Sequence, residues 1–481
     1  MKKIISIVTC LAVAVLTACS PSPSNVVKTN DKAPIYPDYT DITIPVNIAP
    51  LNFLVRGDAE AVCVYVNEEE FESSNGNTVT FPESDWKELL VANQGKEIKV
   101  RIDAEINGQW REYKSFYWKV VSDKVDPYLT YRLIEPDYEV YNDLVLQERC
   151  VENFEEKNFC DHGLVGNKCM NCHTYASQDP NTSMFYVRGE GGGAILNLNG
   201  KLQKLNLKRQ DMVSGSVYFG FSPSERYIVF STNVIIPAFH SQGSKRLEVF
   251  DTKSDVYVAD LQSGKFLESP LLSDSMQMET FPTFTPDGKY IYYCTAERID
   301  SIGALKNQKY SLCRVSFDEK TGNIGSQVDT VYNAGIEGKS VCHPRISPDG
   351  QFIIFTVADY GTFPIWHREA DLMMMDLKTN RLISMAMANS NMSDTYHSWS
   401  SNSRWLVFAS KRDDGLYGKP DFTYINKDGQ CSKPFCLPQE NPDHYDNCLK
   451  SYNAPELGKG PLPFSAKDVM NALSTTPMDF K

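Results

Sequence analysis

The sequence has no excess of positive charge, few histidines and a single long apolar run. Its 481 residues include 48 lysines and arginines against 61 aspartates and glutamates, a net charge of −13. A chain this acidic has no general electrostatic attraction for nucleic acid or anionic lipid. Beyond the N-terminal segment, no apolar run approaches the ~20 residues of a transmembrane helix. The G-x-S-x-G, H-E-x-x-H and Walker patterns are also missing, so the sequence carries no signal of those enzyme classes.

The N-terminus predicts export and lipid attachment. Residues 1–3 are basic, and residues 4–16 form an apolar run of 13 residues, which is too short to span a bilayer and typical of a signal-peptide core. The next segment, Leu16-Thr17-Ala18-Cys19, resembles the bacterial lipobox. We therefore predict a signal peptide over 1–18, lipid on Cys19 and a flexible tether over 19–37. An ordinary signal peptide with an incidental cysteine is the alternative.

The predicted location is the cell envelope. Ser20 follows the cysteine, in place of the aspartate that resembles an inner-membrane retention signal. We therefore expect a protein anchored in the outer membrane and facing the periplasm. The membrane is then its first partner, reached through the lipid, and no nucleic-acid partner is expected.

The composition favours an all-β protein that begins with a small sandwich. The chain has 25 Tyr, 24 Phe, 28 Gly and 26 Pro residues, which favours strands and turns over helices. Alternating runs within residues 38–132, such as 61–66 and 97–102, and the hairpin signal Asn107-Gly108 predict about seven short strands. We expect an immunoglobulin-like β-sandwich there.

A ten-residue pattern recurs four times in the second half of the chain. The copies start at Phe221, Phe284, Ile346 and Trp399, with spacings of 63, 62 and 53 residues. Each copy has an apolar residue, a Ser/Thr-Pro-Asp-Gly-like turn and an apolar strand, and the period suits the four strands of a propeller blade. The pattern resembles the TolB-type propeller repeat.

That resemblance implies a β-propeller over residues 184–461. Five blades are visible in the sequence, and a sixth is expected if residues 435–461 close the ring. The remaining residues, 462–481, are expected to form a C-terminal tail. A linear β-solenoid is the alternative architecture.

The most specific chemical motif is Cys169-Met170-Asn171-Cys172-His173. C-x-x-C-H is the attachment motif of c-type haem, in which two thiols add to the vinyl groups and the histidine ligates the iron. We expect this motif in a polar loop of a connector over residues 133–183, with haem c as the cofactor. The sixth iron ligand is left open among Met184, His162 and a histidine of the propeller. A disulfide or redox pair and a zinc site are the alternatives.

Four of the seven histidines fall at blade positions that open on one face of the propeller. His343 and His397 come three and two residues before a repeat copy, whereas His240 and His367 lie in loops between second and third strands. Other side chains expected in this funnel are Arg345, Asp359, Trp366 and Arg368. Three roles for the histidines stay open, namely loop-tying hydrogen bonds, a metal or ligand site, and an axial haem ligand.

The cysteine count is compatible with an oxidising compartment. Apart from Cys10 and Cys19, 11 cysteines remain, an odd number, so at least one is expected to stay unpaired. The local disulfide candidates are Cys150 with Cys160 and Cys431 with Cys436.

Together, the haem motif, the segment Phe-Tyr-Val-Arg-Gly-Glu-Gly-Gly-Gly at 185–193 and the repeat resemble a family of Bacteroidetes lipoproteins often described as cytochrome c-like. The resemblance covers about residues 125–460 and implies electron transfer or docking of a redox or envelope protein. The alternative is a non-redox scaffold or a glycan- or metal-binding propeller. Oligogalacturonate lyases, propellers with a histidine-rich metal site, resemble this chain only through the repeat.

Overall fold

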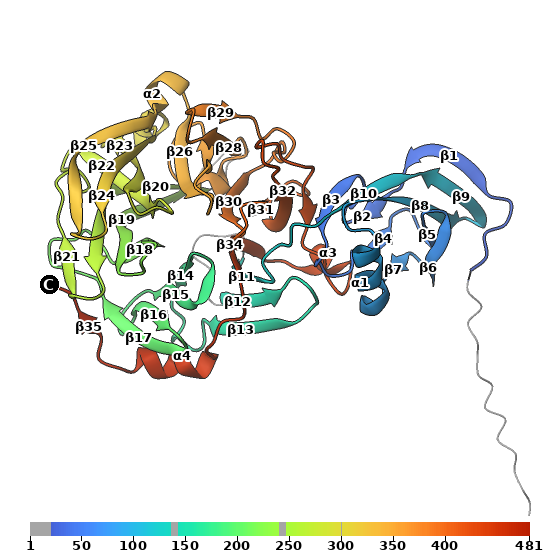
Figure 1. Ribbon diagram of the computed structural model, residues 1–481, viewed down its shortest axis with the longest axis horizontal. Helices are drawn as coiled ribbons and strands as arrows, with labels where there is room; N and C mark the ends of the chain where they lie inside the picture. The colour runs from blue at the N-terminus through green and yellow to red at the C-terminus, as the bar shows by residue number, and fades with distance from the viewer. Residues whose placement is uncertain (1–20, 136–142, 240–246, 300) are drawn as a thin grey trace, which may run out of the picture.

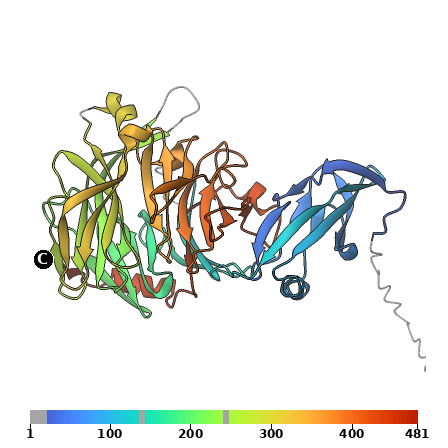
Figure 2. The ribbon, with the colours of Figure 1, turned by 45° about the horizontal axis from the view of Figure 1, so that its top comes forward.

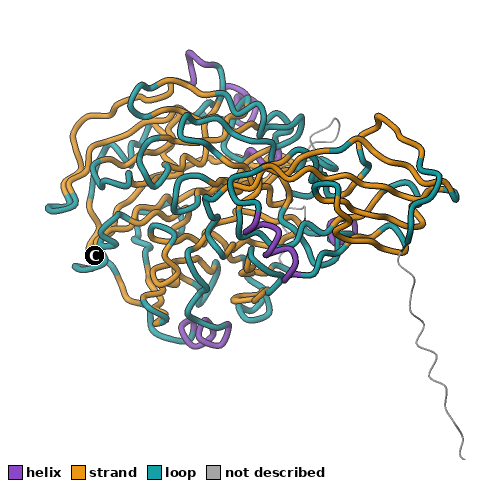
Figure 3. The backbone as a smooth tube through the Cα atoms, turned by 45° about the vertical axis from the view of Figure 1, so that its right-hand side comes forward, coloured by secondary structure: helices purple, strands orange, loops and turns teal. Residues whose placement is uncertain are grey.

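The structure is a computed structural model that describes residues 21–481 except 136–142, 240–246 and 300. The predicted signal peptide, Cys19 and His240 lie outside the described residues. Strands predominate throughout (Figure 3), in a smaller N-terminal domain and a larger ring of sheets that lie side by side (Figures 1 and 2). Within the described ranges, no helix combines the length and the apolar character needed to cross a membrane.

The N-terminal domain contains two sheets and a helix. Its larger sheet has the strands β1 (Val27–Lys32), β3 (Ile42–Pro45), β5 (Ala59–Val66), β6 (Glu69–Asn75), β8 (Glu97–Ile106), β9 (Gln109–Lys114) and β10 (Phe116–Val121). Its smaller sheet has the strands β2 (Ile35–Tyr36), β4 (Phe53–Val55) and β7 (Thr78–Val79). Helix α1 (Glu83–Ala92) packs Trp86 into a hydrophobic cluster that contains residues of both sheets. The immunoglobulin-like topology is not confirmed, since the larger sheet includes the parallel pairs β1–β9 and β10–β3.

The predicted tether is too long. Strands β1 and β2 both lie within residues 19–37, and β1 pairs with β9 from Val27 onward. The polar composition of this segment hid the pairing, because β1 is an edge strand whose side chains are mostly exposed. Such a strand gains its stability from backbone hydrogen bonds rather than from an apolar face.

Six sheets form the larger part of the molecule, and we number them as blades in chain order from the inner strand outward. Blade 1 has β34 (Ser451–Gly458), β11 (Tyr128–Ile134), β12 (Val145–Cys150) and β13 (Glu156–Asp161), and blade 2 has β14 (Met170–Ala176), β15 (Asp179–Val187), β16 (Gly193–Leu198), β17 (Lys201–Asn206) and β35 (Met478–Asp479). Blade 3 has β18 (Ser216–Phe221), β19 (Tyr227–Phe239), β20 (Leu247–Asp260) and β21 (Lys265–Leu267), and blade 4 has β22 (Gln277–Phe284), β23 (Tyr290–Glu297), β24 (Ser311–Asp318) and β25 (Asn323–Tyr332). Blade 5 has β26 (Ser340–Ile346), β27 (Phe352–Ala358), β28 (Asp371–Asp376) and β29 (Arg381–Ile383), and blade 6 has β30 (Asp394–Trp399), β31 (Trp405–Ser410), β32 (Lys419–Tyr424) and β33 (Phe435–Cys436). Short helical segments join them, namely η1 (Ile302–Asn307), α2 (Ala334–Glu337), η2 (Pro364–Trp366), α3 (His444–Asn447) and α4 (Ala466–Leu473).

The six inner strands close into a ring. Each of β14, β18, β22, β26, β30 and β34 contacts the next, and β34 contacts β14 (Figure 1). A linear solenoid is therefore excluded, and the propeller-like ring has six blades. The closing strand β34 comes from the C-terminal side and completes blade 1, whose other strands precede the rest of the ring in sequence.

Three predicted boundaries are wrong as a result. The sandwich was expected to reach residue 132, but β11 starts at residue 128 and belongs to blade 1. The segment 133–183 is no connector, since it supplies strands of blades 1 and 2, and the ring does not begin at residue 184. The segment 462–481 is no free tail, because α4 packs in a cluster with blades 1 and 2 and β35 pairs with β17.

The same hydrogen bond recurs in all four copies of the repeated pattern. In each copy, the hydroxyl after the first apolar residue accepts a hydrogen bond from the backbone N–H five residues later, which closes the turn between the first two strands. The pairs are Ser222 with Tyr227 at 3.2 Å, Thr285 with Tyr290 at 3.1 Å, Ser347 with Phe352 at 2.9 Å and Ser400 with Trp405 at 3.0 Å.

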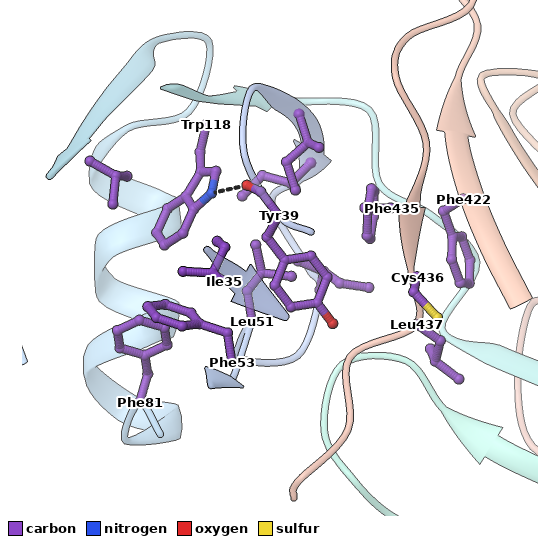
Figure 4. Packing of buried hydrophobic residues seen from close by; sticks show 14 of the residues in the cluster. Ile35, Tyr39, Leu51, Phe53, Phe81, Trp118, Phe422, Phe435, Cys436 and Leu437 are labelled. Atoms are coloured by element: carbon purple, nitrogen blue, oxygen red, sulfur yellow. Dashed lines mark hydrogen bonds between the residues drawn. The ribbon is translucent and has the colours of Figure 1, made fainter. Parts of the chain in front are cut away.

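The N-terminal domain and blade 6 share one hydrophobic cluster. Tyr39 lies between the sheets of the N-terminal domain and blade 6, where Phe422, Phe435 and Leu437 face it (Figure 4). Trp118 of β10 donates its indole N–H to the carbonyl of Tyr39 at 2.8 Å. A shared apolar core of this kind fixes the two domains relative to each other.

All 11 cysteines that the structure describes are free. Cys150 and Cys160 cannot form the predicted disulfide. Cys160 of β13 lies opposite Leu146 of β12, and Leu146 is four residues from Cys150 along β12, too far for the bond. Cys431 lies opposite Ile425 and Cys436 lies opposite Asp421. Because these two partners are four residues apart along the chain, the two cysteines lie apart as well. Neither predicted disulfide is present.

Candidate functional site

Each inner strand of the ring carries a β-bulge at the same place. There the pairing register shifts by one residue, and the first bulge residue has a positive φ. These residues are Ala454 (50°) in blade 1, Cys172 (57°) in blade 2, Tyr218 (54°) in blade 3, Phe281 (50°) in blade 4, His343 (52°) in blade 5 and Tyr396 (50°) in blade 6. A bulge redirects side chains, and all six of these residues line one central cavity.

The cavity has a volume of about 150 Å³, room for roughly ten water molecules. The residue that follows each bulge residue lines it as well. These second residues are His173, Phe219, Pro282, Pro344, His397 and Pro455. Because successive side chains of a regular strand point to opposite faces, the bulge is what brings two neighbours into the same wall.

Aromatic rings from four consecutive blades form a belt around part of the cavity. The ring centroids of Tyr218 and Phe281 are 4.4 Å apart, those of Phe281 and His343 4.0 Å, and those of His343 and Tyr396 4.8 Å. Blades 1 and 2 place the smaller Ala454 and Cys172 at this position, so the belt is open on their side.

The C-x-x-C-H motif lies on that open side. Cys169, Asn171, Cys172 and His173 all line the cavity. The motif was expected in a polar loop, but most of it lies in β14, the inner strand of blade 2. The motif is therefore part of a bulged strand rather than a loop.

His173 is buried, and neither ring nitrogen has a hydrogen-bond partner among the described residues. Burial lowers the pKa of the imidazole to about 4, and the carbonyls of Thr130 and Ala454, which lie nearby outside hydrogen-bonding geometry, offset this only in part. Arg132 and Arg345 lower the pKa further. His173 is consequently neutral at physiological pH, the state in which an imidazole binds a metal.

His343 and His397 lie in the same cavity wall, as predicted for two of the funnel histidines. Burial lowers the pKa of His343 well below its usual value and that of His397 to about 3. Nε2 of His397 lies 3.0 Å from the carbonyl of Ile354, whereas Nδ1 of each histidine has no partner among the described residues. The two histidines stand at neighbouring positions of equivalent bulges. His343 is itself the bulge residue of blade 5, whereas His397 follows Tyr396, the bulge residue of blade 6.

His367 lies elsewhere. Its Nε2 is 3.0 Å from Oε1 of Glu248 and its Nδ1 3.0 Å from Oε1 of Glu369, and the ring is 1 % exposed. Tyr360 donates a hydrogen bond to the same Glu248 at 2.7 Å. This histidine therefore links the segment before β28 to β20, an arrangement of the first kind among the three roles left open by the sequence.

Other predicted residues also miss the cavity. Met184 is buried behind His173 and lines with it a separate small cavity of about 10 Å³. Asp359 pairs with Lys339 at 2.6 Å, and Arg368 donates to a backbone carbonyl. His162 follows β13 and does not line the cavity, whereas the predicted Arg345 and Trp366 do.

Sequence reasoning missed several residues of the wall. They are Arg132, Arg188, Tyr218, Phe281, Tyr396 and Lys411. A signal for the aromatic ones exists, since Tyr218, Phe281 and Tyr396 each stand three residues before a copy of the repeat, the register of His343. Across the chain that the structure describes, no group of three or more His, Cys, Asp or Glu side chains is placed to hold a metal ion.

No family model and no curated protein matches the chain. Solved structures that it resembles include prolyl oligopeptidase B from Galerina marginata, at 10% identity over 70% of this chain and 42% of that chain with a TM-score of 0.35. Others are a DUF4784 family protein from Bacteroides caccae (8% identity, 85% and 98% coverage, TM-score 0.31) and the periplasmic gluconolactonase from Pseudomonas aeruginosa (14%, 55% and 81%, 0.26). The chain thus spans less than half the length of the peptidase.

Proposed function

We propose that the protein is a lipid-anchored, c-type cytochrome-like propeller that carries electrons in the cell envelope. One observation supports this above the others. Cys169, Cys172 and His173 line a single cavity, both thiols are free, and neither nitrogen of the neutral His173 has a partner among the described residues.

The residues of the cavity fit a c-type haem. Cys169 and Cys172 would hold the two vinyl positions, and His173 would ligate the iron. Bound haem would supply one-electron transfer at a potential set by its axial ligands and surroundings. His343 lines the same cavity with Nδ1 free of any described partner, so it would be available as a further iron ligand.

The size of the cavity bears on where such a group would sit. About 150 Å³ is less than the roughly 300–1,000 Å³ of a pocket that encloses a drug-sized ligand. A haem held by these residues would therefore be only partly enclosed. A partly exposed haem edge would shorten the distance of electron transfer to a docked redox partner.

The test uses the full chain expressed in a host with active cytochrome c maturation. We expect haem that stays on the chain in a denaturing gel and an absorption spectrum of a reduced c-type haem. His173→Ala should retain some covalent haem with an altered reduced spectrum and potential, because the vinyl bonds need only the thiols. Cys172→Ala should leave at most one thioether, whereas the control Cys448→Ala, a half-buried cysteine in another part of the chain, should match the wild type. A colourless wild-type protein would end the haem proposal.

The second candidate is a non-redox, TolB-like propeller that binds a ligand in the same cavity. The aromatic belt of Tyr218, Phe281, His343 and Tyr396 favours it, since aromatic rings can stack on planar or sugar ligands. In that case His173→Ala changes no colour, and the cysteines serve only packing. The haem stain decides between the two candidates.

A further inference from the structure

The charge of the cavity wall is opposite to that of the chain. Among the described residues, four cationic side chains line it against two carboxylates, in a protein with a net charge of −13. The cations are Arg132, Arg188, Arg345 and Lys411, and the carboxylates are Glu135 and Glu456. A cavity lined by one sign of charge attracts ligands of the opposite sign, because its low-dielectric walls focus the field.

The carboxylate deepest in this wall is already engaged. Glu456 accepts a hydrogen bond from the Thr174 hydroxyl at 3.1 Å and lies 3.5 Å from the guanidinium of Arg345. Arg132, by contrast, has no ion pair among the described residues, and its buried Nε has no hydrogen-bond partner there. A buried guanidinium N–H without a partner is costly, so this position needs an acceptor from a ligand or from water.

Further unpartnered polar atoms lie in the same wall. They are Oδ1 of Asn171, Nδ1 and Nε2 of His173, Nδ1 of His343, Nδ1 of His397 and Oδ1 of Asn453. Most buried polar atoms of a folded protein are hydrogen-bonded. Their concentration around one cavity indicates that the cavity holds something polar in the working protein.

The apolar part of the wall restricts the shape of the occupant. Tyr218, Phe281 and Tyr396 present ring surfaces, and Lys411 lies 4.6 Å from the centre of the Trp366 ring. Burial lowers the pKa of Lys411 to about 8, so the ammonium is still largely protonated at pH 7. Aromatic surfaces beside cationic groups match a ligand with a flat apolar body and an anionic end.

We infer that the central cavity binds a planar or aromatic ligand that carries a carboxylate-like anionic group, with Arg132 and Arg345 as the anion contacts. The inference goes beyond electron transfer, and it stands whether or not the cysteines carry haem. The chemistry has two sources, since the carboxylates of an attached haem and those of a free aromatic acid both satisfy it. The alternative occupant is water alone.

The test uses the full chain with Cys169→Ser and Cys172→Ser, which leaves the cavity without covalent haem. The probes are 8-anilinonaphthalene-1-sulfonate, which is anionic and aromatic, and its uncharged relative N-phenyl-1-naphthylamine, both titrated by fluorescence at low salt. We expect one saturable site for the anionic probe, weaker binding in 0.5 M NaCl, and a preference for the anionic probe of about tenfold or more.

Arg132→Gln should weaken the anionic probe by about tenfold and change the uncharged probe less than twofold. Arg132→Lys should restore part of the loss. The control Arg381→Gln removes an equal charge from an exposed position on the outer strand β29 and should change neither titration. Arg345→Gln gives the same readout if Arg132→Gln proves unfolded by circular dichroism.

Equal affinity for the two probes, or an anionic titration unchanged in both arginine variants, would overturn the inference. No saturable binding of either probe would overturn it as well and leave water as the occupant. A wild-type chain with haem attached that no longer binds the anionic probe identifies haem as the source of the carboxylates. A colourless wild-type chain that still prefers the anionic probe identifies a free acid, and it defeats only the haem proposal.

Discussion

Ala454 offers a clean test of the bulge that positions the cavity wall. It is the bulge residue of β34, the strand that closes the ring, with φ at +50°. A left-handed conformation costs an L-residue with a Cβ about 1–2 kcal/mol, and glycine adopts it without that cost. Against this, glycine loses more conformational freedom on folding, roughly 0.5–1 kcal/mol. Ala454→Gly should therefore raise the free energy of unfolding by about 0.5–1 kcal/mol.

The matched control is Ala409→Gly in β31. Ala409 is fully buried and does not have a positive φ. The substitution brings the same entropic cost and also removes a buried methyl group, which contributes about 0.8 kcal/mol. It should lower the free energy of unfolding by about 1.5 kcal/mol. The two alanine-to-glycine changes are thus expected to have opposite signs.

Both variants can be compared with the wild type by guanidinium denaturation followed through tryptophan fluorescence. Equal slopes of the unfolding transitions would show that only stability has changed. If Ala454→Gly destabilises the chain as much as Ala409→Gly does, residue 454 has no left-handed conformation and the bulge is not as described. The result matters for function, because equivalent bulges hold Cys172 and His343 towards the cavity.

Three further outcomes are expected. Trp399 and Phe284 end equivalent inner strands and are 2 % and 6 % exposed. Trp399→Ala and Phe284→Ala should each lower the free energy of unfolding by ~3–5 kcal/mol in chemical denaturation. A loss below ~1 kcal/mol would contradict the blade alignment. Cys19→Ser should release the protein from the membrane fraction, whereas an unmodified N-terminus at another residue in mass spectrometry would refute lipid attachment. The folded state lowers the pKa of Lys411 from 10.5 to about 8, so it disfavours the protonated form. Lys411→Met should therefore be more stable than the wild type at pH 7, with an advantage that shrinks as the pH rises from about 8 towards 10.5; a pH-independent difference in melting temperature would refute this.

Local patterns in the sequence were sufficient for blades 3 to 6. The turn that starts at residues such as Ser347 is held by side chains within five residues of one another, so its signature is readable without knowledge of the rest of the chain. The same holds for the C-x-x-C-H motif, whose chemistry depends on spacing alone. The repeat therefore predicted blades 3 to 6, and the histidine pattern placed His343 and His397 near the channel.

What the sequence could not decide depends on pairing between distant segments. In blade 1, β11 pairs with β34, which is more than 300 residues away in the sequence. Only this long-range pairing shows that the start of the predicted connector, residues 133–183, belongs to the ring. Strand β1 is polar and pairs with β9 through backbone hydrogen bonds and the Lys28–Glu112 ion pair, which leave no pattern of apolar residues. The cavity itself arises because six bulges meet at one axis, and each bulge is defined by register with a neighbouring strand. Residues such as Arg132 and Tyr218 share a wall only after the ring has closed. The sequence therefore determined the four repeat-bearing blades and the C-x-x-C-H motif, while closure of the ring decided what surrounds them.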